Sequence, residues 1–253
     1  MQSDLSQTEP WVLPFACGPH RNSAGNDRSL FDRVRGPRAG VRAELTARGF
    51  VFWDKPPLRV LCRILNDAVA LLRTSARLEA AVRAAVGEIV LLRAGSAFDI
   101  THSEPRWPQT IFVSVPGRPS QVSALRAAEN IVHEAMHLQL TTLEQAHPLV
   151  ADKQAQMASP WRKEPRDLQG VLHGLYVFRC ITAFFATPSL SRVLNPEGAA
   201  HVERRQAQIA EELSHLDCNQ LANGMTPKGR IFLTALAGEL SAQPPVARVP
   251  RLP

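Results

Sequence analysis

Several features that direct proteins out of the reducing cytoplasm are missing from this sequence of 253 residues. Its four cysteines are scattered, with no C-x-x-C pair, a distribution typical of free thiols in a reducing compartment. No apolar run approaches the roughly 18 residues needed to span a bilayer. The first ten residues are polar and lack the apolar core of a signal sequence. These absences predict a cytoplasmic protein with no membrane association.

A block of like charges is also absent, although 29 Lys and Arg against 23 Asp and Glu give a net charge of +6. The basic residues are mostly Arg and are spread along the chain. No basic run is interleaved with aromatic residues, as nucleic-acid-binding surfaces usually are. Nucleic acid is therefore not an expected partner. A mild positive field suits an acidic peptide or an anionic co-substrate.

The length and the 45% hydrophobic content fit one large domain with a real core. We expect a single domain over residues 28–242, preceded by an N-terminal arm (1–27) and followed by a disordered, Pro-rich tail (243–253). Helical spacing of apolar residues predicts helices over 29–49, with a break at Gly36-Pro37, and over 58–72, 76–93, 121–146, 165–186, 197–221 and 227–240.

Strand-like alternation appears in only two places, residues 97–103 and 110–115, where β-branched and aromatic residues dominate. The pair predicts a β-hairpin or two strands of a small sheet. The second strand leads almost directly into the helix that Ser120 caps, and its segment 111–115 is a plausible edge for pairing with an extended peptide. The expected fold class is mainly α with a small β-sheet (α+β): a helical bundle with a zincin-like local layout.

The helix expected over 121–146 contains the sequence His133-Glu134-Ala135-Met136-His137, an H-E-x-x-H motif. Positions i and i+4 of a helix lie on one face, so both imidazoles point at one small volume and could hold one divalent metal. Glu134 lies about 100° around the helix from His133 and could reach a metal-bound water. The alternative is an amphipathic core helix that carries two histidines by chance.

Two histidines need a third ligand, and the usual motif positions do not supply one. Leu140 and Leu143 stand where the metzincin pattern requires Gly and His. Glu164, the nearest gluzincin candidate, precedes the expected helix start at Pro165. His173, in the middle of an apolar helix, is the better candidate, because a buried polar ring is costly unless something satisfies it. A hydrogen-bonded core histidine is the alternative.

Arg166, Gly170 and His173 fall at i, i+4 and i+7, on one helix face. An Arg and a His facing inward around a Gly leave space for an anion beside a metal, and Arg binds carboxylates bidentately. Three neutral imidazoles could hold Zn(II) with an open position or form a three-His face on Fe(II). The chemistry of the site does not choose between the two metals.

Together, these motifs resemble the HExxH-type peptide β-hydroxylases, which depend on Fe(II) and 2-oxoglutarate and modify ribosomally synthesised peptides. The resemblance covers roughly residues 95–185. The segments that carry it are Asp99–Pro105, Ile111–Pro116, Glu129–Leu140, Trp161-Arg162, and Arg166 with Gly170–Tyr176.

The resemblance implies His133, His137 and His173 as iron ligands. It implies Arg166 as the partner of the distal carboxylate of 2-oxoglutarate, with Arg162 as the substitute.

The other residues that the resemblance brings in have less direct roles. Glu134, the base in peptidases, would stand beside the iron ligands as a catalytic-site carboxylate. His102 and Ser103 would lie near the co-substrate or the peptide. Tyr176 could hydrogen-bond into the site, or simply pack in the core.

The implied activity is β-hydroxylation of a residue in a precursor peptide, with dioxygen as oxidant and 2-oxoglutarate as co-substrate. Two alternatives remain at this point. One is a zinc metallopeptidase with Glu134 as general base. The other is a non-catalytic peptide-binding protein with a vestigial metal site.

Overall fold

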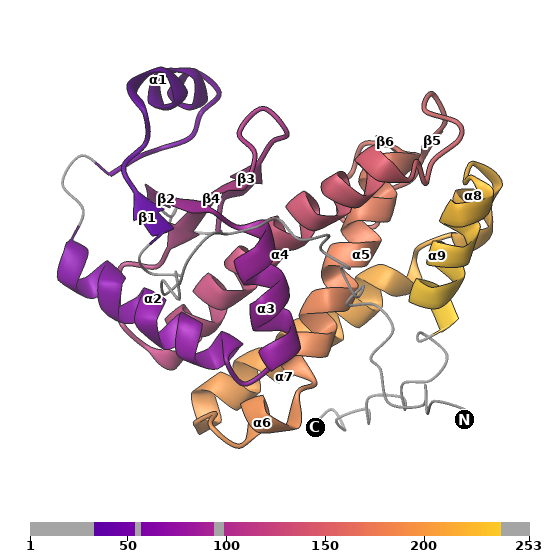
Figure 1. Cartoon of the computed structure of the whole chain (residues 1–253). Coiled ribbons are helices and arrows are strands. Elements are labelled where there is room, and N and C mark those ends of the chain that lie inside the picture. Colours follow the sequence, from indigo (N-terminus) through magenta and orange to yellow (C-terminus); the bar gives the residue numbers. More distant parts are fainter. Residues whose placement is uncertain (1–32, 54–56, 94–98, 239–253) are drawn as a thin grey trace, which may run out of the picture.

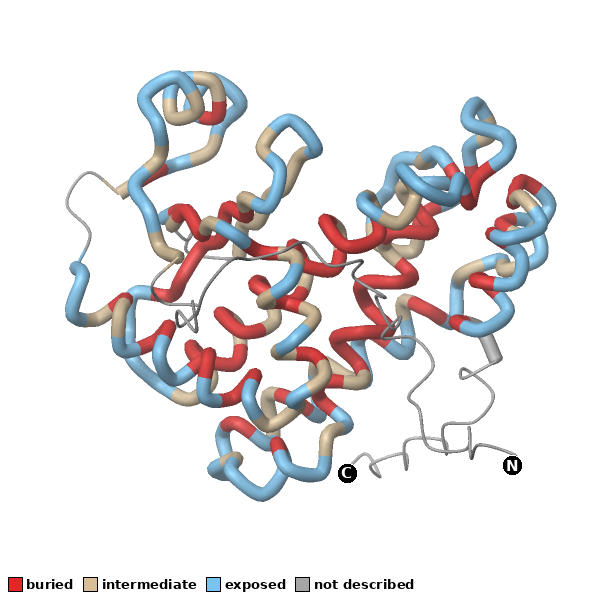
Figure 2. The backbone as a smooth tube through the Cα atoms, in the orientation of Figure 1, coloured by how far each residue is buried: buried red, intermediate tan, exposed pale blue. Residues whose placement is uncertain are grey.

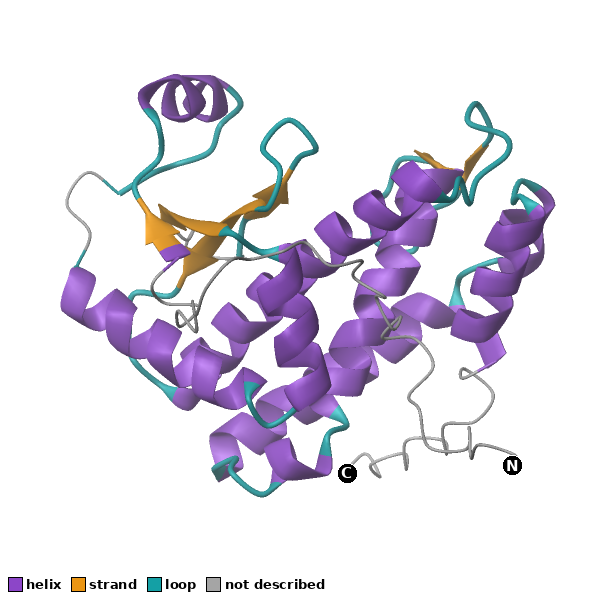
Figure 3. Ribbon diagram, viewed as in Figure 1, coloured by secondary structure: helices purple, strands orange, loops and turns teal. Residues whose placement is uncertain are grey.

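The computed structural model describes residues 33–53, 57–93 and 99–238 (Figure 1). The expected N-terminal arm (1–27) and the Pro-rich tail (243–253) lie outside these residues. The described chain is mainly helical with a small mixed sheet, which confirms the predicted fold class. Figure 3 shows the sheet on one side of the helical body.

The helices are α1 (Ala39–Ala47), α2 (Leu58–Leu72), α3 (Ala76–Ala85), α4 (Gln121–Ala146), α5 (Leu168–Phe185), α6 (Pro188–Ser191), α7 (Pro196–Ser214), α8 (Cys218–Asn223) and α9 (Pro227–Gly238). The strands are β1 (Val34–Arg35), β2 (Glu88–Arg93), β3 (Thr101–Ser103), β4 (Thr110–Val115), β5 (Gln156–Met157) and β6 (Arg166–Asp167). The predicted helices over 58–72 and 121–146 are confirmed at both ends.

The main sheet has the strand order β1-β2-β4-β3. β2 and β4 run parallel, from Glu88 opposite Thr110 to Arg93 opposite Val115. β3 pairs antiparallel with β4, which confirms the predicted hairpin. Because β4 lies between β2 and β3, it is not the free edge that the sequence suggested for peptide pairing. The outer strand on that side is β3.

The prediction of one helix over 76–93 was wrong in its second half. The helix α3 ends at Ala85, and the chain continues as β2 from Glu88 to Arg93. Ile89 and Leu92 fit the spacing of a helix, but the run from Val86 is also apolar and β-branched enough for a buried strand. This segment forms a strand because it pairs with β1 on one side and with β4 on the other.

Three other helix boundaries differ from the prediction. The segment before Gly36 forms β1, and the helix begins only at Ala39. The helix expected from Pro165 begins at Leu168, because Asp167 accepts a hydrogen bond from the backbone of Gly170 and caps it. The helix expected over 197–221 divides into α7 and α8, and Asp217 caps the second of these.

The helix α4 is the central element, and it contacts α2, α3, α5, α7 and the sheet. Figure 2 shows buried residues concentrated along α4 and α5. α5 is long and apolar enough to cross a membrane by composition, but 72% of it is buried inside the fold. Such burial is typical of a helix in the core of a fold. The close contact of α4 with α5 brings the H-E-x-x-H motif next to His173.

The N-terminus of α4 offers a test of the fold. Ser120 accepts a hydrogen bond from the backbone N–H of Ser123 at 3.0 Å. We expect Ser120→Ala to lower the free energy of unfolding by about 1 kcal/mol, because this N–H loses its partner. Ser120→Asp should keep most of the stability. Urea denaturation at equilibrium measures the stability of both variants. Equal stability of the two variants and the wild-type protein would contradict the assignment of Ser120 as the cap.

Candidate metal centre

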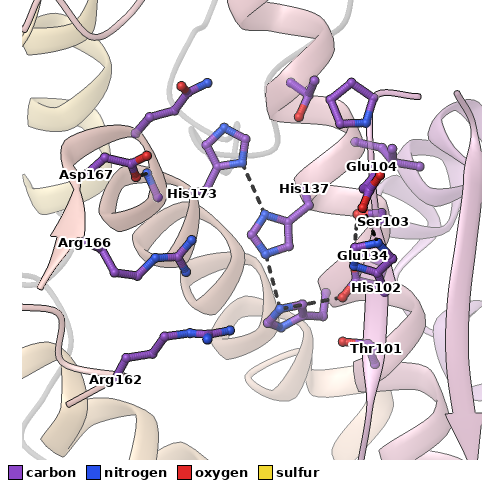
Figure 4. A pocket seen from close by; sticks show the side chains of 16 residues that line it. Thr101, His102, Ser103, Glu104, Glu134, His137, Arg162, Arg166, Asp167 and His173 are labelled. Atoms are coloured by element: carbon purple, nitrogen blue, oxygen red, sulfur yellow. Dashed lines mark hydrogen bonds and ion pairs between the residues drawn. The ribbon is translucent and has the colours of Figure 1, made fainter. Parts of the chain in front are cut away.

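The three histidines predicted as ligands line one cavity of about 420 Å³ between α4, α5 and β3 (Figure 4). α4 supplies His133 and His137, and α5 supplies His173. The other candidates that line it are Glu134, His102, Ser103, Arg162 and Arg166. All the predicted site residues except Tyr176 therefore meet at one place.

The imidazoles form a row with His137 in the middle. His133 Nε2 lies 3.2 Å from His137 Nε2, and His137 Nδ1 lies 3.2 Å from His173 Nδ1. Two nitrogens bound to one ion at about 2.0–2.1 Å are themselves about 3 Å apart. Each neighbouring pair thus has the spacing of two ligands on one metal.

The row does not yet converge on a single point, because one ion cannot take both nitrogens of His137. Within the described ranges, no three His, Cys, Asp or Glu side chains are grouped for one metal. The lone pairs of Nδ1 and Nε2 point to different sides of an imidazole ring, so His133 and His173 lie on nearly opposite sides of His137. A metal held by all three rings would therefore require the side chains to move from their positions in this structure.

Burial keeps the first two imidazoles neutral, which is the form that binds a metal. Desolvation lowers the pKa of His133 to about 4, with a smaller effect from Arg205. Desolvation, with the nearby His133, lowers the pKa of His137 to about 3. The ring of Phe178 closes one side of His133, with ring centroids 5.7 Å apart.

Glu134 is buried and tied to the sheet. The hydroxyl of Ser103 donates to Glu134 Oε2 at 2.6 Å, and Glu134 Oε1 lies 3.9 Å from His133 Nε2. Only 3% of Glu134 is exposed. Ser103 was predicted to lie near the co-substrate or the peptide; in the structure β3 holds it over α4, beside the H-E-x-x-H motif.

His102 also lines the cavity, but the contacts of its ring are with residues outside the group of histidines. Its Nε2 lies 3.0 Å from Glu104 Oε1, and its ring packs among Phe50, Trp107 and Phe112. Although burial raises the pKa of Glu104, hydrogen bonds from Arg48, Arg106 and His102 lower it to about 2. His102 therefore anchors the rim of the cavity.

Two guanidinium groups face the row of imidazoles across the cavity. Figure 4 shows Arg162 and Arg166 pointing toward the histidines from the segment before α5. Within the part of the chain that the structure describes, neither guanidinium makes a hydrogen bond or ion pair. Two unneutralised positive charges on one wall make this side of the cavity a site for an anion.

Two glycines of α5 permit close packing beside the cavity. A Cβ on Gly170 would lie 2.9 Å from Arg166 Nη2 and 2.6 Å from Asp167 Oδ1. A Cβ on Gly174 would lie 2.5 Å from the ring of Trp161, which stacks on Phe178. The predicted space around Gly170 is thus filled by the guanidinium itself.

Tyr176 is the site residue that the structure places elsewhere. It is fully buried, its hydroxyl donates to Gln139 Oε1 at 2.6 Å, and its ring packs against Phe232. It does not line the cavity. The assignment to co-substrate binding was therefore wrong, and packing in the core, the alternative given above, accounts for Tyr176.

Sequence reasoning missed Glu144 and Gln169. Glu144 Oε2 lies 2.8 Å from His173 Nε2, and the side chain of Gln169 donates to the same oxygen at 2.7 Å. Glu144 stands seven residues after His137, two helical turns along the same face, and Gln169 stands four before His173. That spacing was the available signal.

Protein-family models and characterised proteins were both searched, and neither gave a match to this chain. The assignment of the site therefore depends on its geometry.

The lowered pKa values predict how the stability of the metal-free protein depends on pH. The unfolded chain binds protons at His133 and His137 near pH 6.5, whereas the folded chain binds them only near pH 4 and 3. Stability should therefore fall as the pH drops from 6.5 to about 4, by up to about 1.4 kcal/mol per pH unit for each histidine.

Urea denaturation of EDTA-treated protein across this pH range measures the effect. The double variant His133→Leu/His137→Leu should show a flatter profile. An identical slope in variant and wild type would reject the buried, neutral state of these rings.

Proposed function

We propose that this protein is a non-haem Fe(II)- and 2-oxoglutarate-dependent dioxygenase that β-hydroxylates a residue in a ribosomally synthesised precursor peptide. The metal ligands are His133, His137 and His173. Arg166 binds the distal carboxylate of 2-oxoglutarate, with Arg162 beside it. The observation that carries the proposal is the pairing of two unneutralised guanidiniums with three imidazoles across one cavity. The cytoplasm, where thiols stay reduced, is the proposed location.

The size and charge of the cavity support a small dicarboxylate together with part of a peptide. A volume of about 420 Å³ lies within the range of small-molecule sites. Bound iron with 2-oxoglutarate and dioxygen supplies the oxidising power for C–H hydroxylation, with succinate and CO₂ as by-products. The protein supplies neutral imidazoles and a guanidinium clamp that orients the co-substrate.

The edge of β3 is the proposed docking place for the peptide. The N–H of Ser114 donates to the carbonyl of Ile100, so the next pair, Thr101 and Val113, belongs to the non-hydrogen-bonded kind. The N–H and C=O groups of Thr101 and Ser103 then face away from β4, along the border of the cavity. An extended peptide can pair with them by strand addition.

A zinc metallopeptidase is the second candidate. The observation that favours it is the position of the Glu134 carboxylate, 3.9 Å from His133 Nε2 and on the cavity wall, where a general base could activate a metal-bound water. The hydrogen bond from Ser103 occupies one oxygen of that carboxylate. The two guanidiniums have no evident role in peptide hydrolysis, which ranks this candidate second.

Anaerobic titration of the protein with Fe(II) and 2-oxoglutarate tests the proposed function. We expect a visible metal-to-ligand charge-transfer band from the chelated co-substrate, and succinate formation when oxygen is admitted. His133→Ala should abolish the band, because a ligand is lost. Absence of the band in wild-type protein, together with cleavage of peptides by the zinc-loaded form, would favour the peptidase instead.

The guanidinium clamp has its own prediction. We expect Arg166→Ala to weaken 2-oxoglutarate binding by roughly 10- to 100-fold, because a charge-assisted hydrogen bond to carboxylate contributes about 1.5–3 kcal/mol. The affinity for Fe(II) alone should stay unchanged. Isothermal titration measures both, and Arg192→Ala, an exposed arginine outside the cavity, is the matched control. A loss with Arg162→Ala but not with Arg166→Ala would move the clamp to Arg162.

A further inference from the structure

We propose that Glu144 is a positioning residue that fixes the tautomer of His173. The tautomer it selects leaves His173 Nδ1 unprotonated, with a lone pair that can bind a metal. The inference rests on the proposed metal site, and it assigns a role to a residue that the sequence did not indicate. Glu144 lies on α4 and His173 on α5, so their contact bridges the two central helices.

The geometry sets which nitrogen carries the proton. Glu144 Oε2 lies 2.8 Å from His173 Nε2, and the two side chains are only 9% and 11% exposed. An ionised carboxylate can only accept hydrogen bonds, so His173 Nε2 must carry the hydrogen. In a neutral imidazole the other nitrogen then has a free lone pair. That nitrogen, Nδ1, is the one that faces His137.

The carboxylate is itself held in place. The side-chain amide of Gln169 donates to the same Oε2 at 2.7 Å. Gln169 precedes His173 by four residues, so both donors stand on one face of α5 and converge on one oxygen. This arrangement selects one rotamer of Glu144 and one ring orientation of His173 together.

The consequence for metal binding follows from the chemistry of ligating histidines. A ligating imidazole commonly donates its other N–H to a carboxylate, which orients the ring and raises the basicity of the ligand nitrogen. Loss of such a partner typically costs 10- to 100-fold in metal affinity. Without Glu144, His173 would populate both tautomers, and one of them carries a proton on the nitrogen needed for the metal.

Long-range ¹H–¹⁵N spectra of the metal-free protein, in slightly alkaline buffer, report the tautomer directly. We expect wild-type His173 to be protonated on Nε2, and Glu144→Ala to show a mixture of tautomers. Co(II) serves as the metal probe in a parallel titration. Its affinity should fall roughly 10- to 100-fold in Glu144→Ala. Glu211→Ala, which removes an exposed carboxylate of α7 and the same charge, should change neither measurement.

The two measurements separate the inference from the function on which it rests. A proton on His173 Nδ1 in the wild-type protein would overturn the role of Glu144. This measurement does not depend on whether a variant folds. An unchanged tautomer and Co(II) affinity in Glu144→Ala overturn it as well. Failure of the wild-type protein to bind Co(II), with Nε2 still protonated, rejects the metal site while leaving the tautomer assignment intact.

Discussion

The contact between α4 and α5 is the constraint on which the rest of the site depends. α5 is apolar on most sides, and α4 buries residues along most of its length from Ser123 to Leu140, so the two helices pack together at the centre of the fold. Packing them together places the half-buried His133 and His137 beside the buried His173. Desolvation lowers the pKa of His133 and of His137 and keeps these two imidazoles neutral, the form that can bind a metal.

The remaining walls of the cavity come from elements that cross this helix pair. β3 lies over α4 and binds it through Ser103 and Glu134, so the position of the small sheet is fixed relative to the histidines. On the other side, the segment before α5 carries Arg162 and Arg166. The glycine at position 170 lets the guanidinium of Arg166 lie against the start of the helix. The cavity thus has one wall of acid and imidazole and one of guanidinium.

Residue positions that depend on local spacing could be predicted from the sequence. Contacts that depend on a distant strand or helix could not. His133 and His137 share a face because of the helix repeat alone, so their proximity was predictable. Ile89 and Leu92 fit the spacing of a helix, but the continuous apolar run 89–92 also fits a buried strand, and the pairing of β2 with β4 decides between the two. The spacing of Glu144 places it on the face of His137, but its bond to His173, like the bond of Tyr176 to Gln139, joins different helices, so neither partner follows from local spacing.

The charge distribution in the cavity also bears on which of the two proposed activities is favoured. Peptide hydrolysis acts on a neutral amide, and a peptidase needs the metal, a general base and a polar group for the developing oxyanion. Two guanidiniums that have no counter-ion among the described residues exceed that need, and they would repel a bound metal cation unless an anion came between them. In the proposed function, a dicarboxylate that chelated a metal at one end and met Arg166 at the other would neutralise both, and the same anion would remove the cost of holding the guanidiniums opposite the metal.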